Sequence, residues 1–566
     1  MLITAAAYLT VTRRLVNVDL MDEIEKIQNT PIKDASFWSS VLILETQCIA
    51  TQAATITTKL DIVNKLIDPD LYPRSAVLAN GTFPGPTIFG KKGDHFIINV
   101  TNSLTDERML RATTIHWHGI FQNQTNWADG AAMVTQCPIV PDDFFVYDFD
   151  INQAGTYWYH SHYSTQYCDG LRGAIVIYDP NDPYIDEYDV DDESTLITLA
   201  DWIHTASPTP LLSNHSLTTL INGHGRSLQV EVTLNTLSPL AIISVEPGKR
   251  YRFRVASLAC DAPFNFTIHG HKMTIIETDG ESTTPLVVDS LWIYAGQRYS
   301  VIVHANQTIG NYWIRADPLF PRGYPGFDND RNSAILRYAG APEVDPETTD
   351  SSTQPLNEDD LNSIESPQPP GKPELGGADS VIKIKPTWDP KTSLFSINEN
   401  PYTSPSVPVL LQILNGTFDA DQLMPSGSVY KLKGNSSVEL QLHGISKGGP
   451  HPFHLHGHSF WVIKNALSDK YNWVNPARRD TVPTGFDTNL TVIRFFTDNS
   501  GPWFLHCHID WHIPLGLAIV FAEDPEGTLA HLKPPPPSYD KICPAFSNYT
   551  GDIAILGITE PKEHGA

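Results

Sequence analysis

Three segments of this chain repeat the same order of residue types, and this repeat is the strongest constraint on its fold. Each segment contains a glycine followed by aromatic or apolar residues, and each follows a run of alternating polar and apolar residues. The segments are 155–162, 310–317 and 501–508. Similar elements recur upstream of each segment, at 114–119, 267–272 and 453–458. An alternation with a period of two indicates β-strands, and self-similarity on this scale indicates repeated domains.

The simplest arrangement is three copies of one β-sandwich domain, over residues 55–180, 181–341 and 379–566. Residues 342–378 are acidic and rich in proline, which is typical of a solvated linker. Because this linker is long for a compact protein, we expect part of it to pack along the surface. The 44 prolines of the chain also favour strands and turns over long amphipathic helices. We therefore predict an all-β fold.

Charge and hydropathy exclude some partners. The net charge of −26 argues against nucleic acid or an anionic membrane as the main partner. No stretch approaches 18 consecutive apolar residues, so no membrane anchor is expected. Ten Asn-X-Ser/Thr acceptors, roughly twice the chance number, favour a secreted protein with N-linked glycans. They are Asn80, Asn99, Asn123, Asn214, Asn265, Asn306, Asn415, Asn435, Asn489 and Asn548.

Residues 1–54 precede the first repeated domain and do not share its pattern. An apolar run at 37–44, followed by small residues near Ala54, resembles the core and cleavage region of a signal peptide. Glu45 interrupts the run, and 36 residues of mixed charge precede it. We interpret residues 1–54 as a leader or an over-extended N-terminus of a secreted, extracellular protein.

Four His-X-His pairs occur at matching positions of the first and third copies. The pairs are His116 and His118, His160 and His162, His454 and His456, and His506 and His508. Because side chains alternate along a strand, both imidazoles of a pair share a face and reach one metal or two neighbouring metals. A single pair is usually structural, but four repeated pairs predict a metal cluster between the first and third domains. The middle domain has Arg315 and Asp317 at the place of His160 and His162, so we interpret its His269 and His271 as ordinary strand histidines.

Cys507 adds a second kind of site. It lies between His506 and His508, so its side chain points to the opposite face of the strand. His451 and His512 are available to complete a His₂Cys set, which selects copper and describes a blue electron-transfer centre.

These motifs resemble the four copper signatures of the multicopper oxidases. The similarity is closest to secreted fungal laccases of the basidiomycete type, through residues 121–130, 164–173 and 501–505, and it runs from about Ile56 to the C-terminal region. The resemblance implies three cupredoxin-like Greek-key domains. It also implies one-electron oxidation of small phenolic or aromatic reductants, coupled to four-electron reduction of dioxygen to water.

The resemblance further implies four copper ions per chain and a ligand set for each. The type 1 copper takes His451, Cys507 and His512, with Leu517 as an axial neighbour that cannot ligate, which raises the potential. The type 2 copper takes His116 and His454. The two type 3 coppers take His118, His160, His162, His456, His506 and His508.

Three carboxylates and two disulfides follow from the same resemblance. Asp261 accepts the phenolic proton near His512, through whose edge the electron enters, while Asp129 and Asp510 relay protons for dioxygen reduction. The structural alternatives are a turn aspartate for Asp261, loop capping for Asp129 and ligand orientation for Asp510. The disulfides join Cys137 to Cys543 and Cys168 to Cys260.

Other functions remain open on the sequence alone. A ferroxidase has the same coppers, but it needs acidic residues around the electron-accepting histidine and often has a membrane anchor. An ascorbate- or bilirubin-type oxidase more often has an axial methionine, where this chain has Leu517. A non-enzymatic copper-binding protein would tolerate the loss of ligands, and none is missing here. We expect a monomeric laccase-type enzyme.

Overall fold

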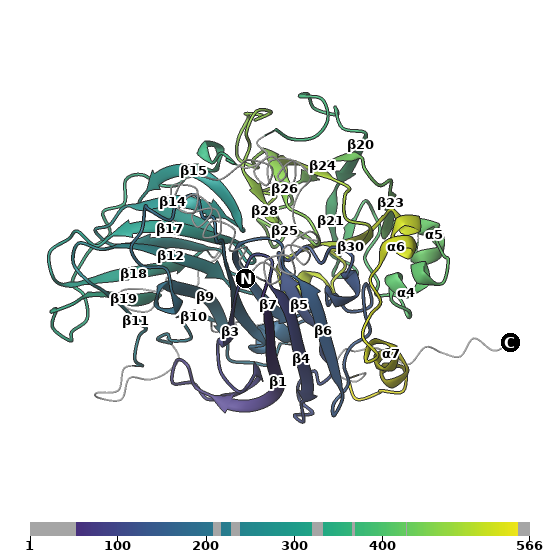
Figure 1. Ribbon diagram of the computed structural model, residues 1–566, viewed down its shortest axis with the longest axis horizontal. Helices are drawn as coiled ribbons and strands as arrows, with labels where there is room; N and C mark the ends of the chain where they lie inside the picture. The colour runs from purple at the N-terminus through teal and green to yellow at the C-terminus, as the bar shows by residue number, and fades with distance from the viewer. Residues whose placement is uncertain are drawn as a thin grey trace, which may run out of the picture. The chain divides into compact units, whose positions relative to one another are not determined.

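The computed structural model describes residues 53–207, 217–227, 238–319, 332–364, 368–425 and 427–552. The predicted leader at 1–54 lies almost entirely outside these ranges, as does Asn214. Strands dominate the described chain and its helices are short, so the all-β prediction is confirmed (Figure 1). No helix in these ranges is long and apolar enough to span a membrane.

The first sheet pair contains two four-stranded sheets. Alternate residues are buried in the nine-residue strand β4, whose sheet has one face in the core. In spatial order, one sheet is β2 (Arg74–Ala79), β1 (Thr55–Ile67), β4 (His95–Ser103) and β6 (Phe144–Asp150). The other is β3 (Gly85–Lys91), β8 (Arg172–Tyr178), β7 (Gly155–Ser161) and β5 (Ile115–His118). Every residue of β5 and β7 is buried, so this second sheet is covered on both faces.

The second sheet pair surrounds a separate hydrophobic core that includes Phe253 and Phe266. Its six-stranded sheet is β10 (Leu217–Ile221), β9 (Leu196–Ile203), β12 (Arg250–Ser257), β17 (Arg298–His304), β14 (Met273–Thr278) and β15 (Glu281–Val288). Its five-stranded sheet is β11 (Ile242–Val245), β19 (Ser333–Tyr338), β18 (Asn311–Pro318), β13 (Phe264–Ile268) and β16 (Ser290–Ile293).

The third sheet pair has two five-stranded sheets and an added hairpin. One sheet is β20 (Ser380–Ile384), β24 (Ser437–His443), β29 (Leu490–Phe496), β26 (Phe460–Lys464) and β27 (Arg478–Arg479). The other is β23 (Val429–Leu432), β31 (Ala518–Glu523), β30 (Gly501–Cys507), β25 (Pro452–Leu455) and β28 (Thr481–Pro483), and the hairpin is β21 (Pro386–Asp389) and β22 (Leu394–Ile397). Short helices connect or follow the strands: α4 (Val409–Leu414), α5 (Ala420–Leu423), α6 (Pro525–His531) and α7 (Tyr539–Ser547). The 3₁₀ turns are η1 (Asn126–Ala128), η2 (Gln166–Asp169), η3 (Glu193–Thr195), η4 (Glu358–Asp360) and η5 (Asp510–His512).

The threefold sequence repeat corresponds to one repeated topology. In each pair, one sheet begins with a parallel contact, β3 with β8, β11 with β19 and β23 with β31. The repeated segments are the next strands, β7, β18 and β30, and their antiparallel neighbours are β5, β13 and β25. His116 pairs with His160 in the first copy and His454 with His506 in the third, whereas Thr267 pairs with Arg315 in the second. The middle copy therefore keeps the strands and lacks histidines at these paired positions. Its His269 and His271, predicted as strand histidines, lie between β13 and β14, so that prediction is wrong.

The segment between the second and third pairs lies against them where the structure describes it. Glu358 in η4 accepts a hydrogen bond from Arg479 at 2.8 Å. Arg494 donates to the backbone carbonyls of residues 370, 372 and 374. The segment predicted as a solvated linker is thus anchored at several points.

One of the two expected disulfides is present. Cys137 and Cys543, 406 residues apart, form a disulfide. The other expectation is wrong for this structure, because Cys168 and Cys260 are buried free thiols. They are hydrogen-bonded neighbours, and Cys168 also donates to Asp510 Oδ2 at 3.6 Å. The two cysteines are neighbours as predicted, but their thiols are joined by a hydrogen bond and not by a disulfide.

Candidate metal centre

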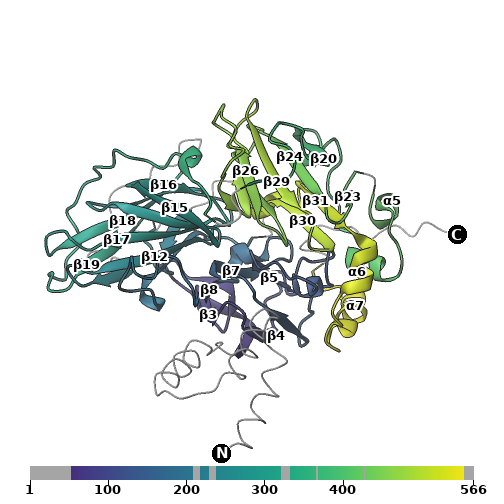
Figure 2. The same ribbon diagram turned by 45° about the horizontal axis from the view of Figure 1, so that its top comes forward.

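Eight histidines converge where the first and third sheet pairs face each other. The strands β5 and β7 lie beside β30 in both views (Figure 1, Figure 2). His118 Nδ1 lies 3.1 Å from His508 Nε2, which joins β5 to the end of β30. His506 Nε2 lies 3.1 Å from His456 Nε2 and 3.4 Å from His162 Nε2.

The histidine pairs use the ends of strands more than their interiors. Only His116 and His118 lie together inside one strand, β5. His162, His456 and His508 each follow the last residue of β7, β25 or β30. The expectation of in-strand pairs is therefore correct for one pair of the four, and the residue just beyond the strand completes each of the others.

The donor set fits transition-metal ions. Ring nitrogens lie within 4.8 Å of one another in three overlapping groups: His116, His118 and His160; His116, His454 and His456; and His162, His456 and His506. Among the described residues, Nε2 of His116, His160 and His454 has no hydrogen-bond partner. Burial is the largest cause of the lowered pKa of His118, His160, His162, His454, His456, His506 and His508. These imidazoles are thus neutral, as metal ligation requires.

A second donor set lies beside the cluster. His451 Nδ1, His512 Nδ1 and Cys507 Sγ form a triangle with sides of 3.2, 3.3 and 3.4 Å. His451 and Cys507 are fully buried, whereas His512 keeps 9 % of its surface exposed. Burial lowers the pKa of His451 to about 4 and raises that of the Cys507 thiol. Because Cys507 lies between His506 and His508, the two donor sets are covalently adjacent.

Two apolar side chains, Leu517 and Phe395, lie near this triangle. Leu517 is fully buried in the same hydrophobic core as Cys507, and its backbone carbonyl accepts a hydrogen bond from Cys507 N at 3.1 Å. Phe395, from β22, lies 4.6 Å from the His512 ring and 5.6 Å from the His451 ring, between ring centroids. Phe395 could not be found from the sequence pattern, because its hairpin has no counterpart in the repeat.

Two buried aspartates orient the cluster histidines. Asp129 Oδ2 lies 2.9 Å from His456 Nδ1, and the Asp129 backbone carbonyl lies 2.7 Å from His116 Nδ1. Asp480 does the same from the third sheet pair, with Oδ1 3.1 Å from His118 Nε2 and its carbonyl 2.9 Å from His454 Nδ1. Such partners fix ring orientation and tautomer. Asp480 was not among the residues predicted from the sequence.

Asp261 and Asp510 lie near the triangle, Asp261 on the loop after β12 and Asp510 in η5 together with His512. Asp201 accepts backbone hydrogen bonds from Cys260, Asp261 and Ala262 and so fixes the loop that follows β12. The Cys260 carbonyl accepts from Asp510 N, which places this loop against η5 and His512. Burial raises the pKa of Asp261 to about 7, with a contribution from Asp201. Burial also raises the pKa of Asp510, well above its ordinary value.

Comparisons with known proteins agree with this geometry. Three family models, each described as multicopper oxidase, match residues 61–182, 193–341 and 402–527. A laccase of Phlebia radiata is 53% identical over 498 residues, which is 87% of this chain and 94% of the relative. Laccase-1 of Pleurotus ostreatus is 51% identical over 501 residues, covering 87% of this chain and 93% of the relative.

Solved structures give the same result. The laccase of Botrytis aclada superposes with a TM-score of 0.75 at 30% identity, over 88% of this chain and 93% of that one. Fet3p, a multicopper oxidase that functions in iron import, superposes with a TM-score of 0.76 at 29% identity, over 87% of this chain and 95% of that one. The chain belongs to the multicopper oxidase family, and it binds copper. It is an oxidoreductase of the laccase type.

Proposed function

We propose that the chain holds four copper ions and couples the oxidation of phenols to the reduction of dioxygen. The triangle of His451, Cys507 and His512 would hold type 1 copper, with Leu517 as the axial neighbour. His116 and His454 would hold type 2 copper, and the other six cluster histidines the type 3 pair. The observation that carries this proposal is the convergence of eight buried histidines next to a His₂Cys triangle.

The chemistry divides between the two donor sets. Copper held by the triangle would supply one-electron oxidation, and copper held by the histidine cluster would supply the four-electron reduction of dioxygen to two waters. Each of four phenols loses one electron and one proton. His512 is the most exposed member of the triangle, so a reductant docks against its edge.

Carboxylates manage the protons and the orientation of the rings. Asp261 lies on the loop packed against η5, where it can accept the phenolic proton. Asp129 contacts two cluster histidines and is placed both to orient them and to pass protons inward. Asp510 is proposed as a second relay, and its carboxylate accepts a hydrogen bond from Cys168.

We also propose a secreted, glycosylated monomer. Six acceptor asparagines have exposed side chains, which an oligosaccharide requires: Asn80, Asn123, Asn306, Asn415, Asn435 and Asn548. Asn99, Asn265 and Asn489 are half-buried. Peptide mapping with and without glycosidase treatment tests this order of use, and glycans mainly at the half-buried sites would contradict it.

Oxygen uptake by the copper-loaded protein tests the reaction. A methoxyphenol, ferrous iron and ascorbate are compared side by side at equal concentration. We expect the methoxyphenol to give the highest kcat/KM. A clear preference for ferrous iron would instead support a ferroxidase, which is the alternative that the fold similarity to Fet3p keeps open.

Replacement of Cys507 tests the ligand assignment separately. Cys507→Ser removes the thiolate, so the intense blue absorption should disappear while the type 2 signal in electron paramagnetic resonance remains. Cys168→Ser is the matched control, because that thiol is also buried and outside the triangle. A Cys507→Ser protein that stays blue would show that the assignment is wrong.

A further inference from the structure

We infer that the middle sheet pair, which contributes no copper ligand, positions the histidine cluster through its turn 294–298. Gly296 and Arg298 are the positioning residues. The turn connects β16, the last strand of the five-stranded sheet, to β17, which lies between β12 and β14 in the six-stranded sheet. This inference rests on the proposed ligand assignment. The experiments below distinguish an error in the inference from an error in the ligand assignment.

Gly296 packs directly against one histidine from each side of the cluster. A Cβ atom at this position would lie 2.9 Å from His118 Cε1, closer than real Cβ contacts, and 3.0 Å from His508 Cδ2, tighter than most of them. The backbone φ of Gly296 is +86°, a conformation that glycine adopts readily. The backbone of the turn therefore forms a wall against which both imidazoles rest, and a side chain would displace them.

Hydrogen bonds hold the turn at this place. Gly296 N donates to the Ser257 carbonyl at 3.2 Å, and Ser257 N donates to the Gln297 carbonyl at 3.0 Å. Gln297 Nε2 donates to the carbonyl of Thr481 in β28 of the third sheet pair, also at 3.0 Å. The turn is thus fixed to its own sheet on one side and, on the other, to the residue after Asp480.

Arg298 links all three sheet pairs at one buried point. Its guanidinium makes a bidentate ion pair with Asp480, with Nη1–Oδ1 at 2.8 Å and Nη2–Oδ2 at 2.6 Å. Its Nε donates to the carbonyl of Thr156 in β7, and Nη1 donates to that of Gly296. Asp480 Oδ1 in turn lies 3.1 Å from His118 Nε2. A two-pronged pair fixes the plane of the carboxylate, so it also fixes the direction from which His118 is held.

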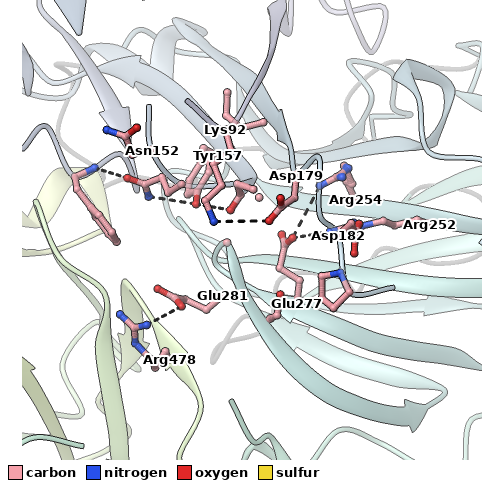
Figure 3. A pocket seen from close by; sticks show the side chains of 18 residues that line it. Lys92, Asn152, Tyr157, Asp179, Asp182, Arg252, Arg254, Glu277, Glu281 and Arg478 are labelled. Atoms are coloured by element: carbon pink, nitrogen blue, oxygen red, sulfur yellow. Dashed lines mark hydrogen bonds and ion pairs between the residues drawn. The ribbon is translucent and has the colours of Figure 1, made fainter. Parts of the chain in front are cut away.

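The surroundings keep this pair dry. Arg298 and Asp480 have 0 % and 2 % of their side-chain surfaces exposed. Tyr157 lies on one side, with its ring centroid 5.5 Å from the Arg298 guanidinium carbon. The same tyrosine lines a polar cavity of about 190 Å³ (Figure 3). Charged groups of this cavity pair with one another, as Arg478 does with Glu281 at 3.0 Å, so they do not compete for Asp480.

Gly296→Ala tests the contact between the backbone of the turn and the two histidines, and Gly248→Ala is its matched control. Gly248, in the same sheet pair, has a φ of +87°, and a Cβ added there would have no heavy atom within 4 Å. Both variants carry the same backbone strain, but only Gly296→Ala reaches the histidines. We expect the affinity of the cluster for copper, measured by chelator competition, to fall about 10- to 100-fold in Gly296→Ala alone. Because His118 and His508 are assigned to the type 3 pair, Gly296→Ala should lose type 3 copper in metal analysis while the blue band stays.

Arg298→Gln and Arg298→Lys test the ion pair. Glutamine removes the charge, whereas lysine keeps the charge and loses the fork. We expect a loss of cluster copper in Arg298→Gln and partial recovery in Arg298→Lys, with an altered type 2 signal in both. Arg494→Gln is the control, because Arg494 is also fully buried and pairs with the buried Glu439, away from the histidines. It should lower stability and leave the signal unchanged.

The outcomes separate the two hypotheses. A wild-type protein that lacks the blue band and four bound coppers would overturn the proposed ligand assignment. If the wild type has both, and folded Gly296→Ala and Arg298→Gln match it in copper affinity and type 2 signal, the inference is overturned. If Gly296→Ala fails to fold while Gly248→Ala folds, the Arg298 variants decide.

Discussion

At the residue scale, the proposal that Leu517 is the axial neighbour of type 1 copper makes a prediction about the reduction potential of that copper. A thioether at this place would add an axial ligand and stabilise Cu(II), whereas an isobutyl group cannot ligate. Leu517→Met should therefore lower the type 1 potential in redox titration and slow the oxidation of high-potential phenols.

The volume change in Leu517→Met is small, so the loss of stability should stay below about 1.5 kcal/mol. Leu440→Met, in the same hydrophobic core, is the control and should leave the potential unchanged. An unchanged potential in Leu517→Met would mean that Leu517 is not the axial neighbour.

Asp261 gives a prediction about pH. Its pKa of about 7 means that the carboxyl group is neutral below that pH and becomes a proton acceptor above it. The wild-type rate with phenols should rise through pH 7, and Asp261→Asn should lack this rise. From the sequence alone, with an ordinary carboxyl pKa, the loss would be greatest at low pH. The buried carboxyl moves the greatest loss to the range between pH 7 and the pKa of the phenol.

The control for Asp261→Asn is a non-phenolic dye that loses only an electron. Its oxidation needs no base, so its pH profile should be nearly the same in both proteins. Equal losses for phenol and dye at every pH would make Asp261 a structural residue.

At the element scale, the two-residue periodicity of the sequence predicted the strands. The contacts that it did not predict depend on how separate strands meet in the fold. The histidine pairs were visible because they repeat in two copies of one topology, and Thr267 opposite Arg315 marks the copy without them. Asp480 and Arg298 were not visible, because an arginine at the start of an alternating strand looks like any other strand residue. Their pairing depends on how β17 meets the turn before β28, which no local pattern encodes.

Arg494 in β29 provides a prediction for the segment between the second and third sheet pairs. It pairs with the fully buried Glu439 at 2.8 Å and donates to carbonyls of residues 370, 372 and 374. Arg494→Met leaves these groups unpaired, which costs about 3–5 kcal/mol for a buried ion pair. We expect faster proteolysis between residues 368 and 378. Lys383→Met, at an exposed position on β20 of the same sheet, should not change the cleavage rate.

At the scale of the whole molecule, the Cys137–Cys543 disulfide joins the first sheet pair to α7, near the end of the described chain. Cys137→Ser with Cys543→Ser should lower the free energy of unfolding by about 2–5 kcal/mol, measured by chemical denaturation. Cys168→Ser with Cys260→Ser is the comparison, since those residues are free thiols. An equal loss in both double variants would mean that the second pair is also bridged in solution.

The histidine cluster is shared between β5 and β7 of the first sheet pair and β25 and β30 of the third. This division has a consequence for biosynthesis. The ribosome makes the histidines of β5 and β7 first, and nearly 300 residues separate His162 from His451. At about 5–20 residues per second, this delay is on the order of 15–60 s. During that time the nascent chain presents four histidines without their partners, and a metal ion captured then would sit in half a site. Correct loading has to wait until β30 has left the ribosome and docked, so metal delivery is a step that follows translation.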